Sequence, residues 1–394
     1  MMRISTSMIY DANVATMNQQ QASLLQTQQQ LATGTRLINP SIDPAATAQA
    51  LAVTQANATN TQYTANSSTA QGTLSIMGTT LQNVTASLQS IRSQMISAGT
   101  NLTTSQRQGL ATSLNGQLQQ LVSLANSTDG TGNYLFSGFQ AKTQPISNTA
   151  AGYAYFGDSG QQMTQVSSTL QVGTTLSGAD IFMRVKNGNG TFVTQAAASN
   201  TGTGVASQGS VTNPALLTGN NYSVAFSVAA GSTTYSVTNT STGTVLSTGN
   251  AYVGGQAISF AGMQFNIQGA PANGDQFTVA PSSNVSIFKT ISDFVTALNT
   301  PAATLNIADA VNNLDAGISS VSNAEAIVGS NLNLITAAQA TGSSLGLNYQ
   351  QTLSQLQDTN FAQAATTLAQ QQLALQAAQK SFAQVSGLSL FTYM

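Results

Sequence analysis

Apolar residues recur along two long stretches of the chain with the alternating three- and four-residue spacing of a packed α-helix. The first stretch runs from Leu74 to Met95 and the second from Val311 to Ile335. This spacing places the apolar side chains of each stretch on one face, and two such faces of matched length predict helices that pack together. The residues expected at this contact are Leu81, Leu88, Ile91 and Arg92 in the first helix and Leu314 and Glu325 in the second.

Glu325 is the one polar residue at an apolar position of the second stretch. A charge at a packed position destabilises a helix pair unless a partner neutralises it, although it can also fix the register of the two helices. Arg92 lies on the opposing helix, so one hypothesis pairs Arg92 with Glu325. The alternative is that Glu325 lies at a solvated edge.

A thinner apolar pattern occupies the two ends of the chain, where single apolar residues recur every seven positions. A seam this narrow, flanked by glutamine, stabilises a lone helix only weakly, so each end needs a helical partner. The pattern predicts a terminal coiled coil, first between the two ends and then with neighbouring copies. An ordinary two-helix hairpin in a globular core is the alternative. The seam residues are Tyr10, Met17, Leu24, Leu31, Phe361, Leu368, Leu375 and Phe382.

Between the helical ends, residues 141–285 carry many of the glycines and aromatics in short alternating runs that are typical of antiparallel strands. Turn residues such as Asn273-Gly274 separate the runs, whereas residues 187–210 read as loop. The expected strands are 222–228, 234–237, 257–260, 263–267 and 276–279.

These patterns predict a multidomain α plus β protein, with a long-helix bundle or coiled coil built from both termini and an inserted, mainly antiparallel β domain. Asp43-Pro44 marks the start of the second helix, since Asp43 can cap it and proline suits its first position. The expected domains are residues 1–42 with 345–394, residues 43–140 with 286–344, and residues 141–285.

Charge is scarce. Nine lysines and arginines and eleven acidic residues make up 5% of 394 residues, against about 25% in an average soluble domain. Histidine, cysteine and tryptophan are absent. The lack of histidine and cysteine excludes the usual zinc, haem and iron–sulfur sites, cysteine nucleophiles and histidine-based triads, so no cofactor is expected.

A net charge of −2 with scattered cations gives no footprint for nucleic acid. Neither a secretory signal peptide nor a run of 18 apolar residues occurs, so no membrane insertion is expected. Asp158, Asp180 and Asp275 lie in turn-like settings, and the glycine-rich turns lack the lysine of a phosphate loop. An enzyme is therefore not expected, whereas a low-charge surface suits dense packing of identical subunits.

Several segments resemble bacterial flagellins and their hook-associated relatives. Those near the N-terminus are Met2-Arg3-Ile4-Ser5-Thr6, Ala32-Thr33-Gly34-Thr35-Arg36, Asp43-Pro44-Ala45-Ala46 and Leu88-Gln89-Ser90-Ile91-Arg92, and Leu368 to Ala377 is similar to the terminal helix of the family. Gly132-Asn133-Tyr134-Leu135-Phe136-Ser137-Gly138 and the ending Val385 to Phe391, followed by Tyr393, resemble the hook–filament junction members of this family.

The resemblance implies a secreted, extracellular structural subunit of the flagellum at the hook–filament junction, exported unfolded by the flagellar type III apparatus. The implied partners are further copies of the chain in a ring, the first hook-associated junction protein, flagellin and a cytosolic export chaperone. The apolar tail residues Leu388, Leu390, Phe391 and Tyr393 are expected to contact the junction partner or the chaperone. A flagellin filament subunit and an extracellular adhesin or tail-like binding protein are the alternatives.

Overall fold

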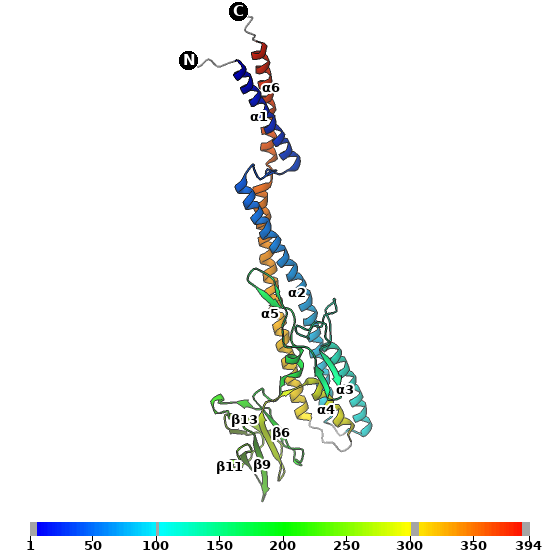
Figure 1. The fold of residues 1–394 in the computed structure, drawn as a ribbon. Helices are drawn as coiled ribbons and strands as arrows, with labels where there is room; N and C mark the ends of the chain where they lie inside the picture. The colour runs from blue at the N-terminus through cyan, green and yellow to red at the C-terminus, as the bar shows by residue number, and fades with distance from the viewer. Residues whose placement is uncertain (1–5, 100–101, 301–306, 388–394) are drawn as a thin grey trace, which may run out of the picture. The chain divides into compact units, whose positions relative to one another are not determined.

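The computed structural model describes residues 6–99, 102–300 and 307–387, which form helices, then strands, then helices again (Figure 1). This order confirms the predicted fold class. The long helices are α1 (Thr6–Thr33), α2 (Pro44–Ser97), α3 (Thr104–Ala125), α4 (Ile287–Asn299), α5 (Ile307–Gln357) and α6 (Phe361–Gly387).

The contacts between residues divide the chain into two compact units. We call residues 1–65 with 338–394 the terminal unit and residues 66–337 the central unit. Helices α2 and α5 each contribute residues to both units. The division into three domains drawn from the sequence stays a prediction.

In the central unit, α2 and α5 pack antiparallel along their apolar faces. All seven apolar residues of the α2 stripe, from Leu74 to Met95, are buried. The α5 residues that face them are Leu314, Val321, Ala324, Val328 and Ile335, each also buried. Helix α3 adds a third apolar face and begins with a capping box, in which Thr103 and Gln106 bond each other's backbone N–H groups.

Strands β6 to β14 form a β sandwich with its own core. One sheet has five strands in the order β11-β10-β9-β14-β6, and the other has the order β12-β13-β7, with β8 also paired to β13. Phe192, Phe226 and Phe277 lie buried between the two sheets. The bounds are β6 (Phe192–Ala196), β7 (Val205–Ala206), β8 (Ser210–Val211), β9 (Tyr222–Ala229), β10 (Ser232–Asn239), β11 (Thr244–Ala251), β12 (Ala257–Phe260), β13 (Met263–Gln268) and β14 (Gln276–Pro281).

The five strands expected from the sequence lie within β9, β10, β12, β13 and β14. The prediction that residues 187–210 are all loop is wrong, because β6 lies inside this range and pairs with β14 from Phe192 to Ala196. The buried Phe192 ring belongs to the sandwich core. Strand β11 was also not predicted, since Thr, Ser, Gly and Asn dominate its sequence.

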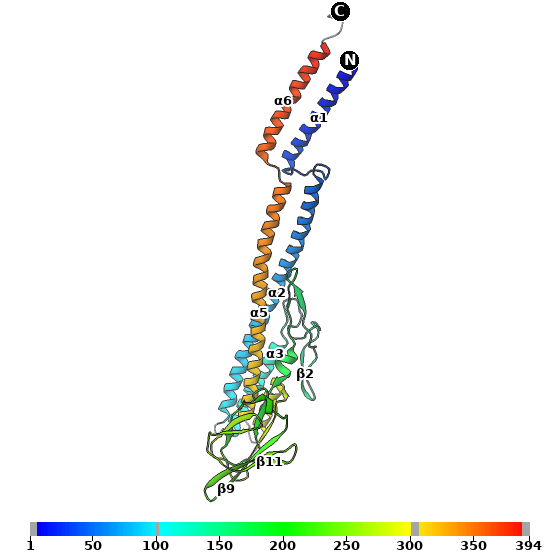
Figure 2. The same ribbon diagram turned by 90° about the vertical axis from the view of Figure 1, so that its left-hand side faces the viewer.

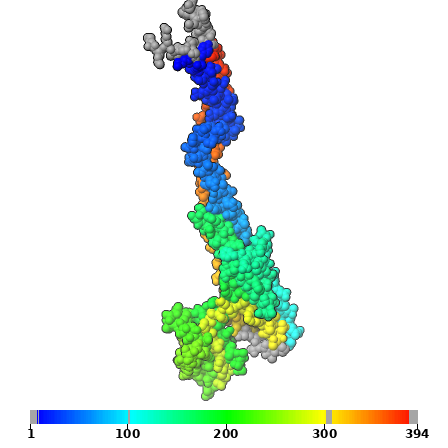
Figure 3. Space-filling model, in the orientation of Figure 1, coloured from blue at the N-terminus to red at the C-terminus, as the bar shows by residue number. Residues whose placement is uncertain are grey.

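The segment between α3 and β6 covers part of the helices of the central unit, as the turquoise-to-green surface of Figure 3 shows. Phe182 of the short helix η1 packs edge-on against Phe136 and also contacts Phe288 of α4. The remaining elements are β1 (Ile146–Thr149), β2 (Gly152–Tyr155), β3 (Met163–Gln165), β4 (Gln171–Gly173), η1 (Ala179–Met183), β5 (Val185–Lys186), η2 (Pro214–Leu216) and β15 (Asn284–Val285).

Candidate assembly interface

Helices α1 and α6 lie side by side and antiparallel in the terminal unit (Figures 1 and 2). The rings of Tyr10 and Phe382 meet edge-on, with centroids 5.3 Å apart. The register set by this contact places Met17 opposite Leu375 and Leu24 opposite Leu368. All six side chains are only half-buried. The structure thus brings most of the predicted seam residues onto one helix pair, with Leu31 half-buried at the end of α1.

Polar and small side chains alternate with these apolar residues. Gln20 of α1 lies at the same register position as Gln371 of α6, and the side-chain carbonyl oxygens of both are buried without a hydrogen-bond partner among the described residues. Thr27 is buried at the next position, where its hydroxyl donates to the carbonyl of Ser23. A polar residue in a helix seam lowers its stability while favouring one register.

The apolar positions alone did not reveal these polar seam residues. Asn13, Gln20 and Thr27 each come three residues after a predicted seam residue, which is the second contact position of a heptad. Reading that position as well as the first would have found them.

Several large apolar side chains of this helix pair point away from the seam. Met8 is 64% exposed and Leu373 is 69% exposed, and Leu25 is also mostly exposed. Phe361, predicted as a seam residue, is 58% exposed. Phe361 is the first residue of α6, and its ring lies against the end of α1. A Cβ added to Gly34 would lie 3.7 Å from this ring. Phe361 therefore marks the end of the seam, at the first residue of α6.

A short backbone bridge ties the end of α1 to the start of α6. Thr35 pairs with Asp358, the amide of Arg36 donates to the carbonyl of Gln357, and the amide of Thr359 donates to Gly34. Gly34 adopts a positive φ of 71°, a left-handed conformation that glycine tolerates best. The bridge therefore joins the connection between α1 and α2 to the connection between α5 and α6.

Arg36 reinforces this bridge from its side chain. Its guanidinium donates to the carbonyl of Leu356 at 3.0 Å and lies 3.6 Å from the carboxylate of Asp43. Asp43 also caps α2, accepting from the amide of Ala46 at 2.9 Å. The segment between α1 and α2 is thus bonded to the end of α5 through Arg36 and to the start of α2 through Asp43.

The structure contradicts the hypothesis that Arg92 pairs with Glu325. Arg92 instead binds both carboxylate oxygens of Asp315, with 3.1 Å between Nη2 and Oδ2. This hydrogen bonding and the charge of Asp315 raise the pKa of Arg92 above its ordinary value. Glu325 lies ten residues farther along α5, about 15 Å at the rise of an α-helix.

Glu325 accepts a hydrogen bond from the hydroxyl of Thr85, at 2.7 Å. It is half-buried beside the helix contact, and Ala324 fills the buried position between Val321 and Val328. The prediction that Glu325 occupies a core position of the α5 stripe is therefore wrong. Leu81, Leu88, Ile91 and Leu314 are buried in the contact as the stripe predicts. The tail residues Leu388, Leu390, Phe391 and Tyr393 lie outside the described residues.

The carboxylates weighed as candidate chemistry mostly hold loops together. Asp275 is buried and accepts from the amides of Thr201, Gly202 and Ala272. Asp158 accepts from the amides of Phe139 and Gly160. Each carboxylate is thus occupied by backbone donors of its own neighbourhood.

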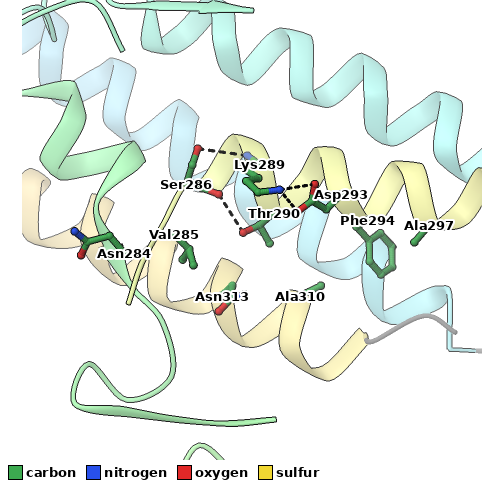
Figure 4. Close-up of a pocket in the computed structure, with 10 residues that line it drawn as sticks. All are labelled: Asn284, Val285, Ser286, Lys289, Thr290, Asp293, Phe294, Ala297, Ala310 and Asn313. Carbon is green, nitrogen blue, oxygen red and sulfur yellow. Dashed lines mark hydrogen bonds and ion pairs between the residues drawn. The ribbon is translucent and has the colours of Figure 1, made fainter. Parts of the chain in front are cut away.

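A cavity of about 390 Å³ lies between α4 and α5. Figure 4 shows residues that line it. Its rim carries Lys289 and Asp293, which are paired to each other at 2.8 Å one helical turn apart, and Phe294 contributes to its wall. Among the described residues, no group of three potential metal ligands occurs, and no helix is long and apolar enough to cross a membrane. The terminal helix pair, which exposes Met8, Leu25 and Leu373, is the candidate functional surface.

Two family models match separate parts of the chain. A model of the bacterial flagellin N-terminal helical region matches residues 4–141. A model of the D2-like domain of flagellar hook-associated protein 1 matches residues 195–281, which include most of the β sandwich.

Two curated relatives match parts of the chain. Flagellar hook-associated protein 3 of Salmonella typhimurium is 37% identical over 182 residues, which cover 46% of this chain and 57% of that protein. Its namesake in Escherichia coli is 35% identical over 175 residues, which cover 44% and 55%. The matches therefore span little more than half the length of these curated relatives.

Solved structures extend the match. Flagellar hook-associated protein 3 of Legionella pneumophila superposes with a TM-score of 0.69 at 30% identity, over 77% of this chain and 98% of that one. FlgL of Xanthomonas campestris gives a TM-score of 0.64 at 32% identity, over 76% and 99%. These matches confirm the resemblance drawn from the sequence. The chain belongs to the flagellar hook-associated protein 3 (FlgL) family.

Proposed function

We propose that this chain is a structural subunit of the bacterial flagellum that joins the hook to the filament. The observation that carries the proposal is the incomplete burial of α1 and α6, whose seam side chains are half-buried and whose outer faces expose Met8, Leu25 and Leu373. Exposed apolar side chains on narrow helices favour further packing. The names of the relatives, which include a flagellar junction protein, support the location.

Copies of the chain are the first partner in this proposal. The terminal helices of one copy pack against those of its neighbours in a ring, so that the outer apolar side chains become buried. Few charges oppose this packing, because α1 and α6 together carry only Asp11 and Lys380. The work of such a subunit is mechanical, and it needs no catalytic group.

The remaining partners follow from the junction role. The first hook-associated junction protein lies on the hook side of the ring, and flagellin lies on the filament side. Similarity of the β sandwich to a domain of hook-associated protein 1 supports common architecture with that neighbour. A cytosolic export chaperone holds the chain before export, and the mature subunit is extracellular.

Deletion of the encoding gene tests the proposal directly. Cells without the protein are expected to keep complete hooks but to release unpolymerised flagellin into the medium, because the filament has no base on which to grow. Restoring the gene is the control. Normal filaments on the deletion cells would contradict the junction role.

A second experiment separates this role from that of a filament subunit. The purified protein is expected to stay monomeric, or to form only short rings, under conditions in which flagellin polymerises. Long filaments grown from the pure protein would instead support flagellin. Deletion of residues 145–285 separates the adhesin alternative. An adhesin would lose its function on this deletion, whereas a junction subunit should still assemble.

A further inference from the structure

The β sandwich is joined to the helices of the central unit through two short chain segments. We call residues 187–283, which contain the sandwich, the β module. The chain enters it through β5 and leaves it through β15, and these strands pair with each other, Lys186 opposite Asn284 and Val185 opposite Val285. Each strand has only two residues.

Both strands continue directly into elements packed on the helical core. Strand β5 follows η1, whose Phe182 is fully buried against Phe136 and Phe288. Strand β15 leads into Ser286, which caps α4 by accepting from the amide of Lys289 at 3.3 Å. No free linker therefore separates the paired strands from the helical core on this side.

On the other side, Asn187 joins the two chain segments where they enter the β module. Its amide donates to the carbonyl of Ser283 at 3.1 Å, and its side-chain oxygen accepts from the amide of Ser283 at 2.8 Å. Its side-chain nitrogen donates to the Ser283 hydroxyl at 3.3 Å, and its carbonyl accepts from the Ser282 hydroxyl at 2.6 Å.

Asn187 is itself buried, with 6% of its surface exposed. The next residue, Gly188, has a φ of 61°, and a Cβ added there would lie 2.2 Å from the carbonyl oxygen of Phe192. Only glycine fits this turn without displacement. Asn187 is buried and bonds the opposite chain segment, and the turn that follows it fits only glycine. These features are typical of a rigid connection rather than of a flexible linker.

We infer that Asn187, together with the paired strands β5 and β15, holds the β module in one orientation on the helices of the central unit. Loss of the Asn187 side chain removes two of the four hydrogen bonds, those to the amide and to the hydroxyl of Ser283. Strands β5 and β15 have only two residues each, so their pairing alone supplies few hydrogen bonds to restrain the module. This inference concerns the isolated chain and does not rest on the junction role.

Spin labels test the inference, and the absence of native cysteine allows labels at chosen sites only. Thr248→Cys on β11 and Gln89→Cys on α2 place labels at exposed positions of the β module and of the helical core. Pulsed electron resonance on the full-length protein should give one narrow distance peak. In Asn187→Ala this peak should be lost to a broad distribution, while circular dichroism stays unchanged.

Asn189→Ala is the matched control. Asn189 lies in the same turn, but its side chain bonds Thr191, Phe192 and Gln208, all within the β module. The peak should therefore stay narrow. Should Asn187→Ala fail to fold, Ser282→Ala removes the 2.6 Å bond alone and should broaden the peak to a smaller extent.

Two outcomes would overturn the inference. A broad distribution in the unmodified protein would show that the joint is flexible. Equal narrow peaks in the unmodified protein, in Asn187→Ala and in Ser282→Ala would show that the hydrogen bonds of Asn187 do not set the orientation.

Discussion

The terminal and central units use the same apolar spacing but bury very different side chains. In the described part of the terminal unit, the buried side chains are three alanines, Ala46, Ala50 and Ala364, and Thr27. The central unit buries large side chains throughout, among them Phe136, Phe182, Leu88 and Met95. The central unit therefore has a hydrophobic core of its own, whereas the seam of the terminal unit is only partly buried.

The difference shows that helical periodicity and stability are separate properties. Ordering the backbone costs about 1–2 kcal/mol per residue, and apolar burial must offset this. The α2–α5 contact does so in the central unit, whereas the half-buried seam of α1 and α6 falls short. The terminal unit therefore leaves apolar side chains exposed, whereas the central unit buries a core of its own.

Limited proteolysis should separate the two units most completely. We expect protease to remove the terminal segments of the isolated monomer and to leave a resistant core near residues 45–340, because the α1–α6 seam buries too little surface. Mass spectrometry of the fragments measures the boundaries. The assembled flagellum is the control, where the ends should resist cleavage, and protection of residues 1–35 in a proven monomer would argue against the comparison.

Cavity-forming substitutions should give the next largest contrast. Phe182→Ala removes a fully buried ring and should lower the free energy of unfolding by about 3–5 kcal/mol. Leu24→Ala, in the half-buried α1 seam, should leave the free energy of unfolding of the central unit within about 0.5 kcal/mol of its value in the unmodified protein. Chemical unfolding of both purified variants, followed by circular dichroism, measures the two effects. Similar losses in both variants would mean that the two units unfold together.

The sequence predicted the long helices well because their signals are redundant. The apolar stripe of α2 repeats without interruption from Leu74 to Met95, and Asp43 and Pro44 mark the start of the helix. Both the helix and its buried face could therefore be predicted. Glu325 was misplaced for a physical reason. Spacings of three and four are both helical, so the pattern from Val321 to Val328 fits Ala324 as well as Glu325. Only the packing against α2 decides between them.

The partner of Arg92 and the edge strand β6 were the hardest features to predict from the sequence. Helix α5 carries several acids, and which of them pairs with Arg92 depends on the register of α2 against α5. Strand β6 follows a glycine-rich turn and gains its order by pairing with β14, which is more than 75 residues away in sequence. A single sequence carries no direct sign of such distant pairings.

The Asp129 turn should give a smaller, pH-dependent effect in the central unit. Burial by itself raises the pKa of Asp129, but hydrogen bonds from Asn133 and Thr131 bring it below its ordinary value. The bonds include those from the amides of Thr131 and Asn133, at 3.0 and 2.8 Å. Asp129→Asn, which removes the charge, should lower the stability at pH 7 by about 1 kcal/mol.

The sign of the pH effect follows from the lowered pKa. The ionised Asp129 contributes its stability above the unfolded-state pKa of about 3.9, and this contribution disappears as pH falls through the lower folded-state pKa. The difference in melting temperature between the unmodified protein and Asp129→Asn should therefore shrink from pH 7 towards pH 3. Asp293→Asn, an exposed helix residue, is the control. A constant difference would show that the charge has no part in the turn.

The Arg92–Asp315 pair should give the smallest effect and sharpens the comparison within the helix contact itself. Its side chains are 40% and 36% exposed, so solvent screens the attraction and the coupling should be below about 1 kcal/mol, despite the two-point geometry. A double-mutant cycle with Arg92→Gln and Asp315→Asn measures this coupling. The same cycle with Arg92→Gln and Glu325→Gln should give none, because Glu325 binds Thr85 instead. Coupling of Arg92 to Glu325 but not to Asp315 would require a different register of α2 against α5, and with it a different set of buried residues along the central unit.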